Sequence, residues 1–307
     1  NPDDHQAWIL RGVALRNLGR YEEAIASYAQ AISVNTDDHQ AWILRGVALN
    51  ESGRYKEAIT SYDQAISINP EDHQVWTNKG VSLHNLGRYE EAIASYAQAI
   101  SINPEDYQAW NNKGFAYFKW GKYVKSIECY NQAISIESDR YNSWHGKGLV
   151  QFVMGNYEDA LNSWQQTFQI IHQLTPRHND IAGLIQEFLE ELIPRFSLPN
   201  SQPQISTFLT QLVTIYQQTQ VLPELTTALI ATLPQILAPN ISDRTADEWL
   251  ALWQNLLGTE PALEMPLRLM NVAIAYKKQP AQQKRLWLGL AKEERSILNG
   301  ALGLEES

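Results

Sequence analysis

The chain has 307 residues, of which 44% are hydrophobic and 19% charged, and a formal net charge of −10. Such a composition is that of an ordinary globular protein. A protein that grips a nucleic-acid duplex needs a net basic face to release counterions from the phosphates, so the acidic balance disfavours nucleic acid as a partner. No apolar run approaches the roughly 20 residues of a membrane-spanning helix, so a membrane is not expected as a partner either.

The single cysteine, Cys129, allows no intrachain disulfide framework and suits a reducing compartment, which favours a cytoplasmic protein. We expect Cys129 to be an inert packed thiol rather than a reactive one. The chain begins with Asn1-Pro2, in phase with a repeat boundary and without an initiator methionine. We interpret it as a fragment or processed form of a longer protein.

A stretch of 34 residues recurs five times between Asn1 and Ile170, closely in the first three copies and more loosely in the last two. A fixed period of this length is typical of repeat architectures, in which one unit cannot bury its apolar face alone and stacks on its neighbours. The sequence therefore predicts repeats at residues 1–34, 35–68, 69–102, 103–136 and 137–170, followed by a second region at 171–307.

Each unit reads as a helical hairpin, because apolar residues recur at helical spacing in two runs separated by a glycine. In the first copy we expect one helix from about His5 to Leu18, a turn at Gly19-Arg20, and a second helix from about Tyr21 to Ser33. The predicted interior consists of Trp8, Gly12, Leu15, Ala24, Tyr28, Ala31 and Ile32. Small residues here let the two helices approach closely, and the aromatic rings fill the space beside them.

The pattern resembles the tetratricopeptide repeat. The resemblance rests on four columns: Trp8, Trp42, Trp76, Trp110 and Trp144; Gly12, Gly46, Gly80, Gly114 and Gly148; Tyr21, Tyr55, Tyr89, Tyr123 and Tyr157; and Ala24, Ala58, Ala92, Ser126 and Ala160. It implies an all-α fold with a right-handed superhelix of five hairpins. For the residues after the repeats we expect an α-helical bundle. Departures are Thr36 and Ser138 at the inter-repeat proline, and Trp164 and Thr167 in the last helix.

Two columns have a chemical alternative. His5, His39 and His73, each beside carboxylates, could suggest a metal or acid/base ladder. Stacked hairpins are about 10 Å apart, however, and zinc–imidazole bonds are about 2 Å long, so we expect polar residues of the first helical turn instead. The five tryptophans could form a ligand cage, but their 34-residue period favours packed stacking anchors.

The resemblance also implies where a partner would bind. In this family the first helix of each hairpin lines a concave groove, and fixed positions on it contact ligands. Carried onto this sequence, the expected partner-binding residues are Gln6, Ile9, Asn17, Gln40, Ile43, Asn50, Gln74, Thr77, His84, Asn85, Gln108, Asn111, Phe115, Phe118, Asn142, His145, Leu149 and Phe152. The basic pocket with which some members clamp a C-terminal carboxylate is not supported by the residues at the matching positions.

The predicted groove changes from amide and small aliphatic groups to an aromatic patch toward its C-terminal end. Amides can pair with an extended backbone, and a few buried aromatic contacts usually dominate binding energy, so a peptide or a helix would fit. The alternative is that Phe115 and Phe152 simply pack against the helices that follow them.

From Pro176 the repeat period is lost but helical spacing continues. An apolar stripe runs from Ile181 to Ile193 and is expected to end at Pro194. A loop at 197–203 should precede helices at about 205–220, 223–238, 243–257, 261–277, 281–290 and 292–302. We expect Pro223, Pro261 and Pro280 at helix starts, and kinks or breaks at Pro234 and Pro266. This region should form an all-helical domain that caps the repeats.

One cluster of basic residues is evident in the sequence, beside Trp287. It consists of Lys277, Lys278, Lys284, Arg285, Lys292 and Arg295. It could bind phosphate or nucleic acid, but solvated helix faces explain such charges more often. The sequence has no phosphate-binding glycine loop, no Cys/His ligand set and no nucleophile elbow. We therefore expect no catalysis, no metal and no cofactor.

The sequence favours a non-enzymatic module that binds a partner peptide or helix in the concave groove. An alternative is the sensor arm of a larger bacterial signalling or defence protein, whose effector domain would lie upstream of Asn1. The near identity of the first and third repeats motivates this alternative, since it resembles recently duplicated arrays of the cyanobacterial type. A weaker option, binding of RNA by the helical repeats, conflicts with the acidic balance.

Overall fold

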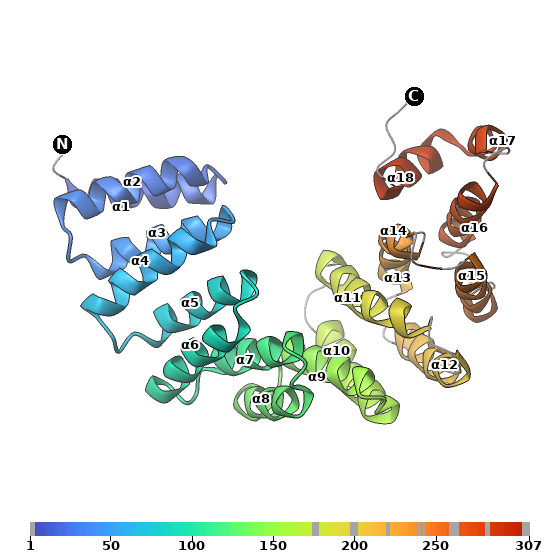
Figure 1. The fold of residues 1–307 in the computed structure, drawn as a ribbon, viewed down its shortest axis with the longest axis horizontal. Helices are drawn as coiled ribbons and strands as arrows, with labels where there is room; N and C mark the ends of the chain where they lie inside the picture. Colours follow the sequence, from blue (N-terminus) through green and yellow to red (C-terminus); the bar gives the residue numbers. More distant parts are fainter. Residues whose placement is uncertain are drawn as a thin grey trace. The chain divides into compact units, whose positions relative to one another are not determined.

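The computed structural model describes residues 4–173, 178–196, 202–218, 222–236, 238, 241, 243–257, 264–279 and 283–302. Every regular element in these ranges is a helix, which confirms the predicted all-α class (Figure 1). The chain divides into two compact units, residues 1–150 and 151–307. The division lies inside the fifth repeat, 20 residues before the boundary expected at residue 170, so the second helix of that repeat belongs to the second unit.

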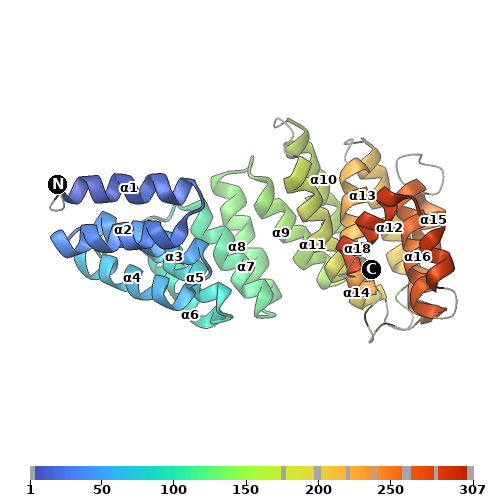
Figure 2. The same ribbon diagram turned by 90° about the horizontal axis from the view of Figure 1, so that it is seen from above.

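In the first unit, successive antiparallel helix pairs follow the predicted repeat (Figures 1 and 2). From α1 to α8 each helix packs on the next, and the first helices of neighbouring pairs also contact one another, α1 with α3, α3 with α5 and α5 with α7. The first helices thus form one layer. The bounds are α1 His5–Asn17, α2 Tyr21–Val34, α3 His39–Glu51, α4 Tyr55–Ile68, α5 His73–Asn85, α6 Tyr89–Ile102, α7 Tyr107–Lys119, α8 Tyr123–Ile136 and α9 Tyr141–Val153.

The ends of the helices follow from the sequence. The Asp38 carboxylate caps α3 by accepting hydrogen bonds from the backbone N–H groups of Gln40 (2.8 Å) and Ala41 (3.1 Å). The glycine between the two helices of a hairpin has a positive φ, +77° at Gly53, which only glycine adopts without strain. Both features recur in the first four repeats, so each hairpin starts and turns at the same positions.

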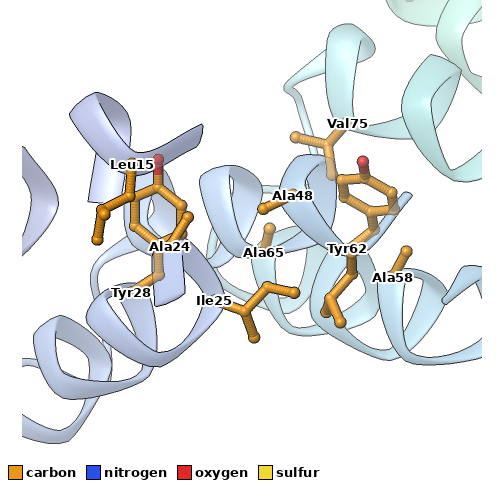
Figure 3. Packing of buried hydrophobic residues seen from close by; sticks show 10 residues of the cluster. Leu15, Ala24, Ile25, Tyr28, Ala48, Ala58, Tyr62, Ala65 and Val75 are labelled. Atoms are coloured by element: carbon orange, nitrogen blue, oxygen red, sulfur yellow. The ribbon is translucent and has the colours of Figure 1, made fainter. Parts of the chain in front are cut away.

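A tyrosine packs against a glycine at the centre of each of the first four hairpins. Tyr28 and Tyr62 are fully buried and lie beside the small residues Ala24 and Ala58 (Figure 3). The Tyr62 ring fits so closely against α3 that a Cβ atom added at Gly46 would lie 2.5 Å from its Cε1 atom. The predicted glycine column is therefore a packing requirement of the tyrosine column.

The tryptophan column joins each hairpin to the loop before it. Trp42 Nε1 donates to the carbonyl oxygen of Thr36 (2.9 Å), and Trp76 makes the same bond to Pro70 (2.9 Å). The rings are half-buried rather than fully packed, with a basic group over each ring, as with Arg45 5.8 Å from the Trp42 centroid. These tryptophans are stacking anchors, as expected, but they act at the inter-repeat loops.

The second unit contains further helices, namely α10 Tyr157–Gln173, α11 His178–Phe196, α12 Gln202–Gln218, α13 Leu222–Ala231, α14 Leu233–Ile236, α15 Asp243–Leu257, α16 Glu264–Lys278, α17 Gln283–Leu288 and α18 Lys292–Leu302. The predicted apolar stripe of α11 is buried from Ile185 to Ile193. Pro194 does not end α11, because it lies in the last turn of a helix that continues to Phe196.

The other prolines mostly act as expected. Pro223 lies in the first turn of α13, and the chain breaks between α13 and α14 just before Pro234. Pro266 also falls in a first turn, that of α16, so it causes no kink. Pro261, Pro280 and most of the loop at 197–203 lie outside the described residues.

The buried tyrosines predict a stability that falls at alkaline pH. Burial raises the pKa of Tyr62 and of Tyr96 above the ordinary value near 10. At a pH between the ordinary pKa of tyrosine and the raised pKa of the folded protein, the folded state binds more protons than the unfolded state. The unfolding free energy therefore decreases as the pH rises above about 10. Urea unfolding from pH 8 to pH 11 should show this decrease, and it should be shallower in Tyr62→Phe/Tyr96→Phe. Equal slopes for the two proteins would contradict the assignment.

Candidate functional site

The predicted partner-binding residues lie on the first helices of the hairpins, and the structure sorts them into three groups. Seven are exposed: Gln6, Asn17, Gln40, Gln74, Asn85, Gln108 and Asn142. Five are half-buried: Ile43, Asn50, His84, Asn111 and Phe115. Six are buried: Ile9, Thr77, Phe118, His145, Leu149 and Phe152.

The six buried residues offer a partner little or no surface. Thr77 donates a hydrogen bond to the Asp106 carboxylate (3.3 Å), and Phe118 packs on Tyr123 with ring centroids 6.1 Å apart. Phe152 is 1% exposed and lies among the rings of Trp164, Phe188 and Phe208. The structure therefore places these six inside the protein, and for Phe152 it agrees with the alternative of packing against later helices.

Two of the half-buried amides join neighbouring hairpins. The side-chain oxygen of Asn50 accepts a hydrogen bond from Ser82 Oγ (2.8 Å), and that of Asn111 accepts one from Ser143 Oγ (2.9 Å). Both bonds run between the first helices of adjacent repeats. These oxygens stabilise the stacking, so the glutamine column at Gln6, Gln40, Gln74 and Gln108 is the more available row of amides.

An aromatic cluster surrounds Phe115, the half-buried member of the predicted patch. The His84 ring lies 4.9 Å from the Phe115 ring, and Lys119 Nζ lies 5.2 Å from the same ring. Burial, with a smaller effect of the Lys119 charge, lowers the pKa of His84. His84 is therefore neutral at pH 7, and the cluster is an apolar surface with one positive charge at its edge.

The histidine column has a role that sequence reasoning missed. His5 pairs with Asp38, His39 Nε2 lies 3.6 Å from Asp72, and His73 Nδ1 lies 2.8 Å from Asp106. Each pair joins one repeat to the capping aspartate of the next repeat. The fourth repeat has Tyr107 and Arg140 at the two equivalent positions, where the guanidinium lies 5.2 Å from the ring.

Other candidate sites have structural explanations. Burial raises the pKa of the Cys129 thiol to about 11, which agrees with an inert residue. Lys277 donates to the carbonyl oxygens of Ala238 (3.2 Å) and Ile241 (3.3 Å), and Lys278 pairs with Asp247. The side chains of Lys284 and Trp287 lie outside the described residues. The basic group of the C-terminal region thus uses several of its charges within the fold.

Two further findings concern metal and membrane. In the part of the chain that the structure describes, no group of three or more His, Cys, Asp and Glu side chains could hold a metal ion. Of the helices in the same ranges, none has the length and apolar character needed to cross a membrane.

Antiparallel helix pairs stacked at a fixed period, with their first helices in one layer, define a helical-repeat protein. Family models described as tetratricopeptide repeat match residues 1–35 and 9–73, 61–94 and 107–140, and one described as TPR repeat matches residues 82–121. The chain is therefore a tetratricopeptide repeat protein, with repeats matched along residues 1–140. Tetratricopeptide repeats are protein-interaction modules.

Solved structures show the same fold. The structure titled "Crystal structure of MamA protein" is 19% identical, with a TM-score of 0.51 over 56% of this chain and 98% of that chain. MamA 41-end from Desulfovibrio magneticus RS-1 is 18% identical, with a TM-score of 0.52 over 56% of this chain and 97% of that chain. The search of curated proteins finds no match. These comparisons do not bear on the alternative of a sensor arm, which stays a prediction.

Proposed function

We propose that the layer formed by α1, α3, α5 and α7 binds a segment of a partner protein. The observation that supports this most is the row of exposed glutamines at the same position of four successive first helices, Gln6, Gln40, Gln74 and Gln108. Their side chains can donate to and accept from an extended backbone at regular intervals along the array.

The cluster around Phe115 would supply the anchor. Half-buried aromatic rings beside a neutral histidine bury apolar surface of a partner at little desolvation cost, and such contacts dominate many interfaces. Lys119 at the edge of the cluster favours a partner segment with an acidic residue next to its apolar one. Phe118, which is buried, contributes to the shape of this cluster rather than to contact.

Capture with the 307-residue chain as bait, followed by affinity measurements on the captured segment, tests the proposal. Phe115→Ala should weaken binding by more than tenfold, about 1.4 kcal/mol or more. The triple change of Gln40, Gln74 and Gln108 to alanine should weaken it by about three- to tenfold, because several modest hydrogen bonds are lost.

The second helices supply a matched control. Gln30, Gln64 and Gln98 are exposed glutamines at one position of α2, α4 and α6. Changing these three to alanine alters helix propensity in the same way but leaves the layer of first helices intact. If this triple variant loses as much affinity as the groove triple variant, or if Phe115→Ala keeps full affinity, the groove assignment is wrong.

A further inference from the structure

The turn between the two helices of each hairpin carries the same Arg–Glu ion pair in the first three repeats. Arg20 pairs with Glu23 (2.6 Å), Arg54 with Glu57 (2.6 Å) and Arg88 with Glu91 (2.5 Å). Each arginine precedes the second helix and each glutamate lies in its first turn. The helix dipole favours an acidic residue there, so the pair suits the start of the helix.

The fourth repeat replaces this ion pair with two lysines. Lys122 and Lys125 stand at the positions of Arg88 and Glu91. Lys119, two residues before the glycine of the turn, adds a third positive charge. Among the described residues none of the three lysines forms an ion pair, and the ammonium group of each lies over an aromatic ring.

The positive charges of these lysines are unfavourable at the start of a helix. The first turn of α8 contains no acidic residue, whereas α2, α4 and α6 each have one or two. Positive charge at a helix N-terminus opposes the helix dipole and costs a few tenths of a kcal/mol or more. Because the neighbouring repeats show the favourable solution, the fourth repeat departs from it at a cost in stability. Such a cost is typical of residues kept for function.

The same turn exposes apolar side chains. Trp120 is 41% exposed and Val124 is 62% exposed, and they stand at the positions of Leu86 and Glu90 in the third repeat. We call Lys119, Trp120, Lys122, Val124 and Lys125 the lysine turn. Lys125 also lines an open pocket of about 420 Å³ beside Trp110 and Tyr117.

We propose that the lysine turn docks an acidic segment of the partner protein, one that carries an apolar side chain among its carboxylates. The inference rests on the proposed function and names the chemistry of the partner. Three unpaired positive charges on a chain of net charge −10 complement an acidic segment, and Trp120 and Val124 bury its apolar residue. Lys119 belongs both to the turn and to the Phe115 cluster, so a segment leaving the groove passes directly onto this surface.

The third repeat supplies the test variant. The substitutions Trp120→Leu, Lys122→Arg, Val124→Glu and Lys125→Glu give the fourth turn the residues of the third, while Lys119 and Phe115 in the groove stay unchanged. The residues introduced already work at these positions in this fold. The variant should therefore unfold at a temperature equal to or higher than that of the wild-type chain.

Fluorescence anisotropy with labelled synthetic peptides measures the binding. The probes are a peptide of glutamates interspersed with leucines, the same peptide with lysine for glutamate, and the same peptide with serine for leucine. The first should bind the wild-type chain most tightly, with an affinity that falls as salt is added. The four substitutions should weaken it by more than tenfold.

Several results would overturn the inference: equal binding of the first peptide to the variant, preference for the lysine peptide, or binding of vesicles rich in phosphatidylglycerol without binding of peptides. The segment captured by the groove separates the two proposals. If Phe115→Ala no longer binds that segment but the four-residue variant binds it with full affinity, the groove proposal is supported and the lysine-turn proposal is refuted. If only the four-residue variant fails to bind the segment, the lysine-turn proposal is supported and the groove proposal is refuted.

Discussion

Replacing Phe152 by alanine should lower the unfolding free energy of the second unit by about 3–5 kcal/mol. Phe152 is 1% exposed, and its ring centroid lies 5.0 Å from that of Phe208, 5.3 Å from that of Phe188 and 6.0 Å from that of Trp164. Removing the ring leaves a cavity among large rigid neighbours that cannot collapse into it. Urea denaturation followed by circular dichroism measures the loss.

Phe115→Ala is the matched control for this experiment. Both phenylalanines were predicted from the sequence to line the groove, but Phe115 is only half-buried. Its truncation should therefore cost clearly less stability, roughly 1–2 kcal/mol, while it removes binding. If Phe152→Ala unfolds no more easily than Phe115→Ala, the packing described for the second unit is wrong.

The contrast between these two residues shows where sequence reasoning stops. The columns of Trp, Gly, Tyr and Ala predicted every hairpin of the first unit, because each column reports packing inside one repeat or against the next. Whether a groove position is open depends on what covers it. At Phe152 the covering rings are Phe188 and Phe208 on α11 and α12, which lie outside the repeat period and follow no pattern that the repeats could predict.

The histidine–aspartate pairs were missed for a different reason. A histidine at the same position of the first three repeats suggests only a ladder of histidines. The useful signal lies between columns. The fourth repeat changes both partners together, to Tyr107 and Arg140, and a paired change of this kind indicates contact between positions 33 residues apart.

The lysine turn could also have been found in the sequence. Lysines at 119, 122 and 125 are a second basic concentration, so the C-terminal group is not the only one. The structure shows that Arg88 and Glu91 form an ion pair in the preceding repeat. Lys122 and Lys125 therefore replace an ion pair by two positive charges.

Gly46→Ala should be a strongly destabilising single substitution in the first unit. The added Cβ would lie 2.5 Å from Cε1 of Tyr62, whose ring is 1% exposed and has no room to withdraw. Overpacking of this kind costs about 1–3 kcal/mol and sometimes more, against a gain of up to about 1 kcal/mol in helix propensity. We expect a net loss of about 2 kcal/mol in urea denaturation.

Two other glycines grade the effect. At Gly114 the added Cβ would lie 3.2 Å from the Tyr130 ring, so Gly114→Ala should leave the unfolding free energy nearly unchanged. At Gly183 the added Cβ would meet nothing within 4 Å, so Gly183→Ala should raise the unfolding free energy by up to about 1 kcal/mol. Tyr62→Leu removes the atoms that the new methyl group meets. Gly46→Ala should therefore cost less in that background, and a double-mutant cycle should show a coupling above about 1 kcal/mol. If the two substitutions changed the unfolding free energy additively, the contact with Tyr62 would not explain why a glycine is required at position 46.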